Sequence, residues 1–393
     1  MAVQYIPVEA LQPGHYVSAL DRPWVETPFL FQGFEITSHN ELETLRTYCR
    51  HVWVDCERSR VAVETASRPE ATCSDLAPLK RQFKDGLEAL GQAREMALDA
   101  CTRVNTRLRK YSQLDLDELA PAVTELHTQV TAYPQVARWL LTLREHEDTL
   151  AEHSVNVCTL AIMMGQALKM ETWQQAEMAL GGLLHDVGKL CLPPRLLSKQ
   201  APLSSTEWKQ IQQAPVYGHK LLQDCGLHPR VLTMVRNHQE RLDGSGFPDG
   251  LRGEQIEQPV RVIGLVNAYD AMTMSRPGFP AMSGYRAMLE LARQAGHRWD
   301  PELVQSFVLL MGIYPAGTCV SLDNGSRAVV VDSKPEARLN PIIAMRRGNG
   351  AKTRWNLTDL SLPRHPRRIR SLDPPDWDHS RLMRFISDQL LAA

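Results

Sequence analysis

The residues of this chain that are best suited to chemistry are three histidines, an aspartate and a lysine in three separate segments. His185 and Asp186 stand at the end of an apolar run, and Lys189 follows three residues after the aspartate. A charged carboxylate is costly to bury in such a run unless a cation or hydrogen bonds compensate it. His153 lies on an earlier segment and His238 on a later one. Each histidine taken singly is more typical of a hydrogen-bonded core residue, so the inference rests on the combination.

These donor atoms together define a class of site. Imidazole nitrogens and carboxylate oxygens suit iron, manganese, nickel or zinc rather than calcium, and an aspartate can bridge two ions whereas a histidine cannot. Bound cations of this kind offset the negative charge that develops on phosphoryl oxygens during displacement. The sequence therefore predicts a metal centre that acts on a phosphate ester.

The composition limits the kind of protein that positions these residues. The chain has 393 residues, of which 43% are apolar and 23% charged, with a net charge of -1. This length supports two or three domains, and the balanced charge gives no indication of a nucleic-acid partner. The eight cysteines form no CxxC pair, which favours reduced thiols in the cytoplasm. No run reaches the roughly 18 apolar residues that a membrane span needs, so we expect no membrane insertion.

The pattern along the chain predicts a multidomain α+β protein with an all-α core. Short alternating segments predict a β-rich N-terminal module over residues 1–66, and a helical linker over 67–115 leads to a helical domain over 116–311. An Asp-Asn-Gly turn at residues 323–325 predicts a hairpin in a small β appendage over 312–362. Residues 363–393 are expected to form a C-terminal tail.

Two helix starts and one long helical seam are marked in the sequence. Thr172 with Gln175, and Ser204 with Glu207, have the spacing of capping boxes. Between residues 74 and 111, apolar residues recur every seven positions, which fits either a coiled-coil dimer or packing within one chain. A homodimer is therefore one of two interpretations of this seam.

The ordered motifs resemble a known family. Residues 149–311 are similar to the HD-GYP domain, a bacterial class of metal-dependent cyclic di-GMP phosphodiesterases within the HD phosphohydrolase superfamily. The matching positions are His153, His185, Asp186, Lys189, His238, Tyr269-Asp270-Ala271 and Ser275-Arg276-Pro277, with Gly246-Phe247-Pro248 where the family has Gly-Tyr-Pro. Residues 5–55 resemble an uncharacterised module that often precedes this domain. The resemblance implies an HD-type helical core, an iron or manganese centre, and Asp186 and Lys189 as catalytic residues.

The sequence departs from the family at three positions that bind metal there. Ala214 replaces a histidine, Gln239 replaces the second of two paired histidines, and Asn267 replaces an aspartate. One ion position then keeps His153, His185 and Asp186, with Asn267 as a weak fourth ligand, whereas the other keeps only Asp186 and His238. The resemblance thus implies one ion or none, and a hydrolysis that is lost or strongly reduced.

Residues that would bind the nucleotide without cleaving it are retained. The family uses cations where this chain has Lys189 and Arg276, and a guanidinium can contact a phosphodiester through two nitrogens. Surface ion pairs are the alternative role for both. The loop Gly246-Phe247-Pro248 serves in the family as a docking surface for diguanylate cyclases, the GGDEF proteins, and is otherwise an ordinary turn.

Three functions remain open at this point. The first is an inactive or weakly active protein of cyclic di-GMP signalling, acting as a nucleotide sensor or a partner scaffold. The second is an active phosphodiesterase that converts cyclic di-GMP to pGpG or GMP. The third is a structural interaction protein that binds no nucleotide. Of these, the missing ligands favour the first.

Overall fold

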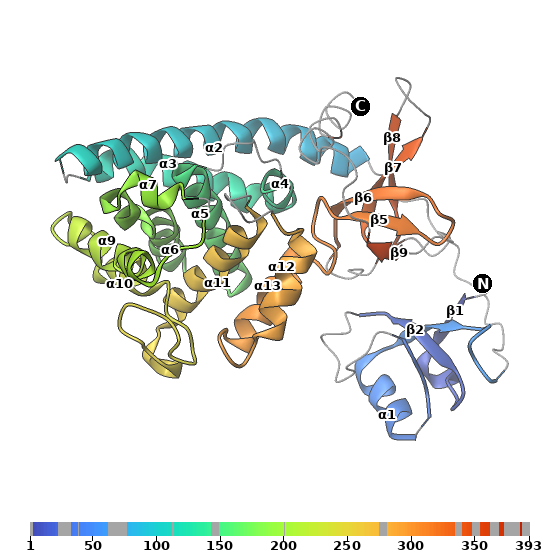
Figure 1. Ribbon diagram of the computed structural model, residues 1–393. Helices are drawn as coiled ribbons and strands as arrows, with labels where there is room; N and C mark the ends of the chain where they lie inside the picture. Colours follow the sequence, from blue (N-terminus) through green and yellow to red (C-terminus); the bar gives the residue numbers. More distant parts are fainter. Residues whose placement is uncertain are drawn as a thin grey trace.

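The computed structural model describes residues 3–22, 33–37, 39–61, 77–111, 114–142, 149–199, 201–274, 281–334, 340–347, 354–361, 369–372 and 386. Helices make up the central part of the chain, and one small β-sheet is formed near each end (Figure 1). This arrangement confirms the expected α+β class with a helical core. Among the described residues, no helix combines the length and the apolar character that crossing a bilayer requires.

The N-terminal module is a four-stranded sheet with one helix. Its strands run in the order β1-β4-β2-β3 and all described pairings are antiparallel. Val52 and Val54 alternate with half-buried residues on β4, and both pack into a core of their own with Ile6 and Val17. The elements are β1 Val3–Pro7, the 3-10 turn η1 Val8–Ala10, β2 Tyr16–Leu20, β3 Phe34–Glu35, α1 His39–Tyr48 and β4 His51–Asp55.

The helical domain begins with a long helix that lies across the other helices (Figure 1). Its elements are α2 Ala77–Tyr111, α3 Leu116–Ala132, α4 Pro134–Leu140, α5 Leu150–Ala167, α6 Thr172–Leu184, η3 Val187–Cys191, α7 Pro194–Leu197, α8 Ser205–Ile211, α9 Ala214–Leu222, α10 Pro229–Asn237, η4 Gly253–Gln255, α11 Gln258–Thr273, α12 Gly284–Arg293 and α13 Pro301–Met311.

The seven-residue seam of α2 packs within the chain. Phe83, Leu90, Ala97 and Val104 are all buried in the core that α2 shares with α3, α4 and α5. An intermolecular coiled coil is therefore not needed to explain the seam. The segment that we expected as a linker contributes a full side of the helical core.

The centre of the domain is α5, whose residues from Ala151 to Gly165 are buried with the exception of the half-buried Glu152. A capping box between Thr149 and Glu152 begins this helix. The predicted box at Ser204 and Glu207 is confirmed at the start of α8. The predicted box at Thr172 is wrong by one residue, because the cap of α6 is Glu171.

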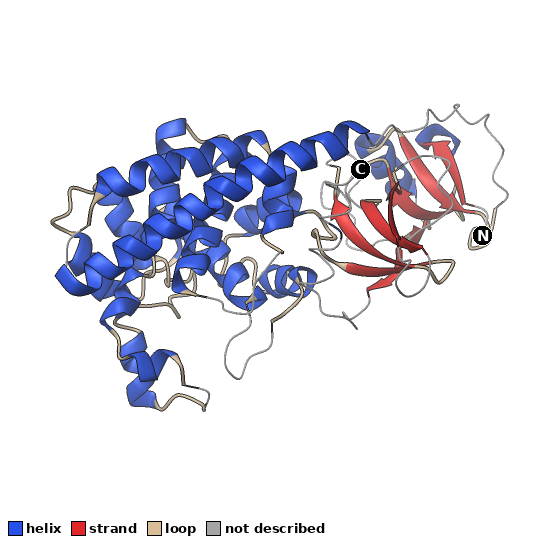
Figure 2. Cartoon of the chain, turned by 90° about the horizontal axis from the view of Figure 1, so that it is seen from above, coloured by secondary structure: helices blue, strands red, loops and turns tan. Residues whose placement is uncertain are grey.

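The C-terminal sheet has five antiparallel strands in the order β8-β7-β6-β5-β9. Figure 2 shows the strands gathered at one side of the helices. The predicted hairpin joins β5 and β6, and Gly325 in its turn has a φ of 78°, which favours glycine. An ion pair of 2.7 Å between Arg138 on α4 and Asp332 connects the sheet to the helices. The strands are β5 Cys319–Leu322, β6 Arg327–Asp332, β7 Ile342–Arg347, β8 Arg354–Asp359 and β9 Ile369–Leu372. Strand β9 thus lies beyond residue 362, where we expected the β appendage to end.

Candidate metal centre

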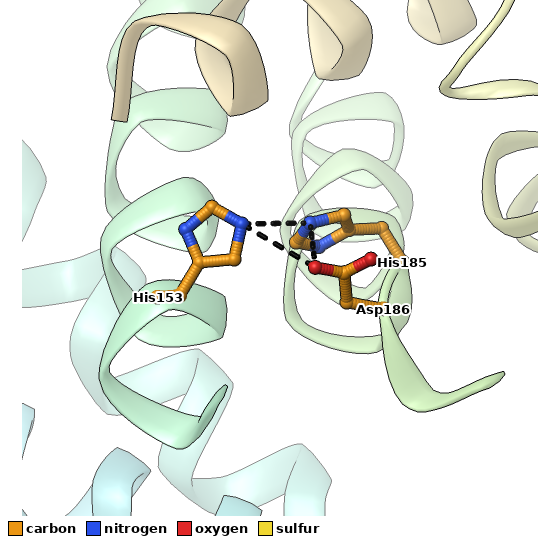
Figure 3. Close-up of side chains that lie close together, drawn as sticks. All are labelled: His153, His185 and Asp186. Atoms are coloured by element: carbon orange, nitrogen blue, oxygen red, sulfur yellow. Dashed lines mark hydrogen bonds and ion pairs between the residues drawn. The ribbon is translucent and has the colours of Figure 1, made fainter. Parts of the chain in front are cut away.

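Two neighbouring helices bring three donor residues together at the centre of the helical domain (Figure 3). His153 projects from the first turns of α5, His185 caps the C-terminal end of α6, and Asp186 follows it directly. One donor atom from each of these residues lies within 4.8 Å of the other two. Among the described residues, no other group of three histidines, cysteines or carboxylates is arranged in this way. All three side chains are buried.

The spacing of these donors fits one divalent ion. His153 Nε2 lies 3.3 Å from His185 Nε2 and 3.5 Å from Asp186 Oδ2, and the remaining pair is 3.4 Å apart. Neighbouring ligands bound at about 2.1 Å lie about 3.0 Å apart around an octahedral ion and about 3.4 Å apart around a tetrahedral one. Asn267 Oδ1 on α11 is 3.0 Å from His153 Nε2 and so borders the same space.

Hydrogen bonds on the far side of each ring orient the nitrogens. His185 Nδ1 lies 2.8 Å from the carbonyl oxygen of Gly182, and His153 Nδ1 lies 2.7 Å from Asp270 Oδ2. Both partners are hydrogen-bond acceptors, so Nδ1 of each ring carries the hydrogen and Nε2 faces the donor cluster. Such outer partners fix the tautomer and orientation of metal-binding histidines. Asp270, for which the sequence indicated no individual role, is therefore a positioning residue.

The electrostatics of the two histidines differ. Burial disfavours the charged form of His185 and lowers its pKa to about 4. Burial acts in the same direction on His153, but hydrogen bonds to Asp186 and Asp270 outweigh it and raise the pKa of that ring. Burial disfavours the charged form of Asp186 too, which for a carboxyl would raise the pKa. The nearby positive charge of Lys189 nevertheless holds that carboxyl well below its ordinary pKa. Asp186 is therefore an anion that a cation must compensate.

Lys189 is the group that links this buried cluster to the surface. Its ammonium lies 2.5 Å from Asp186 Oδ2, and its side chain is 24% exposed whereas that of Asp186 is 3% exposed. The lysine thus reaches solvent from inside the site. The predicted phosphate-binding partner Arg276 lies outside the described residues.

The second ion position contains fewer donors. His238 caps the end of α10, and its Nε2 lies 3.7 Å from Asp186 Oδ1. Its Nδ1 is bound to the carbonyl oxygen of Val235 at 2.9 Å, so Nε2 presents a lone pair. Among the described residues, this buried Nε2 has no hydrogen-bond partner. Buried nitrogens without a partner are rare, so this one marks where a second ion position would lie.

Ala214 and Gln239 stand next to this position without completing it. A Cβ on Gly188 would lie 1.8 Å from the carbonyl oxygen of Ala214, so only glycine allows η3 and α9 to approach this closely. The start of α9 is thereby held beside the segment that follows Asp186, where the buried methyl of Ala214 offers no donor atom. Gln239 Oε1 accepts a hydrogen bond of 3.2 Å from Arg241.

The loop after α10 is held by a residue that the sequence did not single out. The buried carboxylate of Glu240 accepts backbone hydrogen bonds from Asp249, Gly250 and Leu251. A Cβ on Gly246 would lie 2.4 Å from the Cα atom of Glu240, so the loop packs directly on the backbone that follows His238. The loop Gly246-Phe247-Pro248 is therefore anchored at the edge of the second position. The sequence offered no signal of this role, because the burial of Glu240 and its backbone partners follow from the fold.

Comparison with known proteins identifies the families that segments of this chain match. Residues 138–303 match the family described as HD domain, and residues 4–137 match the domain of unknown function DUF3391. A cyclic di-GMP phosphodiesterase of Pseudomonas aeruginosa is 29% identical over 345 residues, which cover 86% of this chain and 83% of that protein. A 3'3'-cGAMP-specific phosphodiesterase of Vibrio cholerae is 36% identical over 132 residues, covering 34% of this chain and 31% of that protein.

Among solved structures, an HDG"Y"P protein from Bdellovibrio bacteriovorus aligns with 78% of this chain and 98% of its own chain, at 16% identity and a TM-score of 0.48. The DUF3391 match extends through α2 and α3, beyond the β-rich module that we expected at the N-terminus. The HD match contains His153, His185, Asp186 and His238. Residues 138–303 therefore form an HD domain, and residues 4–137 before it match DUF3391.

Proposed function

We propose that this chain binds cyclic di-GMP at an HD-GYP-type centre that holds one divalent metal ion and hydrolyses the nucleotide slowly or not at all. The observation that carries the proposal is the inequality of the two ion positions. Three donors of His153, His185 and Asp186 lie 3.3 to 3.5 Å apart at the first. At the second, within the part of the chain that the structure describes, only Asp186 Oδ1 and His238 Nε2 face one another, at 3.7 Å.

In this proposal each residue of the site has a defined role. His153, His185 and Asp186 hold the ion, Asn267 borders it, and Asp270 keeps the His153 ring in its binding orientation. An iron or manganese ion bound there would offset part of the negative charge of a phosphodiester. Lys189 binds a phosphoryl oxygen as an ammonium at the exposed side of the site, and Arg276 is assigned the same kind of contact.

Reduced hydrolysis follows from the missing donors. A pair of ions offsets charge on both the attacking and the leaving oxygen of an in-line displacement, whereas a single ion covers fewer of these atoms. Asn267 supplies a neutral amide oxygen where a carboxylate would add a negative charge, so the hold on a cation is weaker. The chain would therefore act in cyclic di-GMP signalling as a sensor or a scaffold, with GGDEF proteins as candidate partners of the Gly246-Phe247-Pro248 loop.

An active phosphodiesterase is the second candidate, and one observation favours it. The relative from Pseudomonas aeruginosa that aligns over 86% of this chain carries the name of a cyclic di-GMP phosphodiesterase. The Vibrio cholerae relative is named for 3'3'-cGAMP, so both nucleotides belong in the assay. In this candidate Asp186 and Lys189 act in catalysis and the products are pGpG or GMP.

One experiment separates the candidates. Metal content and nucleotide turnover, with added manganese or iron, are measured for the wild type and for the triple variant Ala214→His, Gln239→His, Asn267→Asp. We expect at most one ion per chain and little turnover in the wild type, with a second ion and a gain of turnover in the triple variant. Robust conversion by the wild type, abolished by Asp186→Ala, would establish the active enzyme instead. Calorimetry without any nucleotide signal would favour a purely structural protein.

A further inference from the structure

Two half-exposed aromatic rings stand together where the loop after α10 meets α8. The rings of Trp208 and Phe247 pack edge to face with their centroids 6.1 Å apart. Trp208 is 47% exposed, and Phe247 is half-buried. Neither belongs to the hydrophobic core clusters of the described residues. A pair of large rings held outside the core exposes apolar surface without contributing to a domain's packing.

Both rings are carried by firmly held segments. Trp208 follows Glu207, whose carboxylate binds Lys199 at 2.7 Å and closes the capping box with Ser204. Phe247 sits in the loop whose backbone is bound by Glu240, and its own N–H donates to the carbonyl oxygen of Gln239 at 3.4 Å. The rings are therefore preorganised, so that a ligand stacking on them meets little ordering cost.

The same two segments continue into the metal centre. Gln239 directly follows His238, and α8 leads through residues 212 and 213 into α9, which begins at Ala214. The start of α9 is held against Gly188, the residue before Lys189. Lys189 is in turn the part of the donor cluster that reaches solvent. Two short stretches of chain thus connect the aromatic pair to the donor cluster, one through Gln239 to His238 and one through α9 to the contact with Gly188.

We propose that Trp208 and Phe247 form a stacking platform for a nucleobase of the nucleotide whose phosphate is bound at Lys189 and the metal centre. This inference rests on the proposed nucleotide-binding function and specifies how the base is held. Bases stack on aromatic side chains in a way that tolerates different bases, because every base presents a π-face. The platform therefore selects for a purine or pyrimidine ring on the phosphodiester and contributes affinity rather than base identity.

The size of the platform favours a base over a protein partner. A stable protein interface buries about 800 Å² on each side, whereas two partly covered rings provide much less than that. A single base needs only one ring face of similar extent. The loop Gly246-Phe247-Pro248 therefore has a role in ligand recognition that does not depend on a docked protein.

The test is the affinity of the full chain, loaded with manganese, for cyclic di-GMP by calorimetry. Trp208→Ala and Phe247→Ala are each expected to weaken binding by about 5- to 100-fold, whereas Trp208→Phe and Phe247→Tyr retain a ring and remain near the wild-type value. The losses should be less than additive in the double alanine variant, because both rings serve one base. Trp173→Ala is the matched control, since Trp173 on α6 is 50% exposed and stacks with Arg230.

Two further readouts separate the outcomes. Metal content and thermal unfolding temperature are expected to stay at wild-type values in the Trp208 variants. Inorganic phosphate should compete with cyclic di-GMP equally well in the wild type and in these variants. If the wild type binds cyclic di-GMP and both alanine variants bind it as tightly, the platform is refuted and the nucleotide-binding function stands. If the wild type itself binds no cyclic di-GMP, the proposed function fails and the platform fails with it.

Discussion

The two ion positions that we propose for the centre share Asp186 but are built by different parts of the fold. The first lies between α5 and α6 at the heart of the domain, with three donors and an outer partner on each histidine ring. The second lies toward α9 and α10, where one histidine nitrogen is left without a partner. The helices are close-packed at both, as the contacts of Gly182 with Cys158 and of Gly188 with Ala214 demonstrate. Packing and ligation are therefore separate properties of this site, and one can be lost while the other persists.

The largest effect is expected from Asp186, because both positions depend on it. Asp186→Asn keeps the shape of the side chain and removes the charge that Lys189 and a bound ion compensate. Metal affinity is expected to fall by more than about 100-fold, exceeding the usual effect of an outer partner. Metal analysis after dialysis measures the change. An unchanged metal content in this variant would place the ion somewhere else.

The comparison of positions is tested most directly by two histidine variants. His153→Ala removes a donor of the three-residue cluster, and we expect metal affinity to fall by about 10- to 100-fold. His238→Ala removes the unpartnered nitrogen at the second position. Metal content should then change by less than about 3-fold, since the first position keeps its three donors.

Equal losses in His153→Ala and His238→Ala would contradict the inequality of the two positions. Both substitutions leave a buried space of similar size, so unfolding temperatures provide the control for stability. A ratio close to one ion per chain in His238→Ala, together with a much lower ratio in His153→Ala, would support a single working position.

A smaller effect is expected from the residue that orients His153. The amide oxygen in Asp270→Asn can still accept the hydrogen bond from His153 Nδ1, but the substitution removes a negative charge from the buried pair. We expect metal affinity to fall by about 10-fold. Asp332→Asn is the control. Asp332 lies on the C-terminal sheet, where its carboxylate pairs with Arg138 of α4, so this substitution should leave metal binding unchanged.

Sequence reasoning predicted the class of the fold and the family of the site, because both depend on local patterns. Alternating valines marked β4, the apolar run before His185 marked α6, and the order of the motifs indicated the HD domain. The bounds were less accurate. Glu171 rather than Thr172 is the cap residue of α6, and its backbone N–H donates to Gln174 Oε1 at 2.9 Å.

The parts that the sequence left open depend on contacts between distant segments. The α2 seam fitted two kinds of partner, and only the neighbouring α3 and α5 decided that it packs within the chain. Glu240 and Asp270 act through hydrogen bonds to residues 9 and 117 positions away, which no local pattern contains. The pairing of Trp208 with Phe247 is likewise a consequence of the loop's return to α8.

The smallest effect on metal binding is expected from the loop glycine beside the second position. Gly246→Ala would place a Cβ 2.4 Å from the Cα atom of Glu240 and 2.5 Å from the backbone nitrogen of Arg241. Relief of this overlap requires backbone movement, which costs about 1–3 kcal/mol of stability and displaces the loop that follows His238. Because the three donors at α5 and α6 are untouched, the metal content should remain at the wild-type value.

Gly91→Ala is the matched control for this change. Gly91 lies within α2, where a Cβ would meet no atom within 4 Å, so alanine is expected to stabilise the helix by about 0.5–1 kcal/mol. Chemical denaturation measures both variants, and metal analysis is made on the same samples. Loss of metal in Gly246→Ala would mean that the loop and His238 support the bound ion, and the two positions would then be parts of one cooperative centre rather than a working site beside a depleted one.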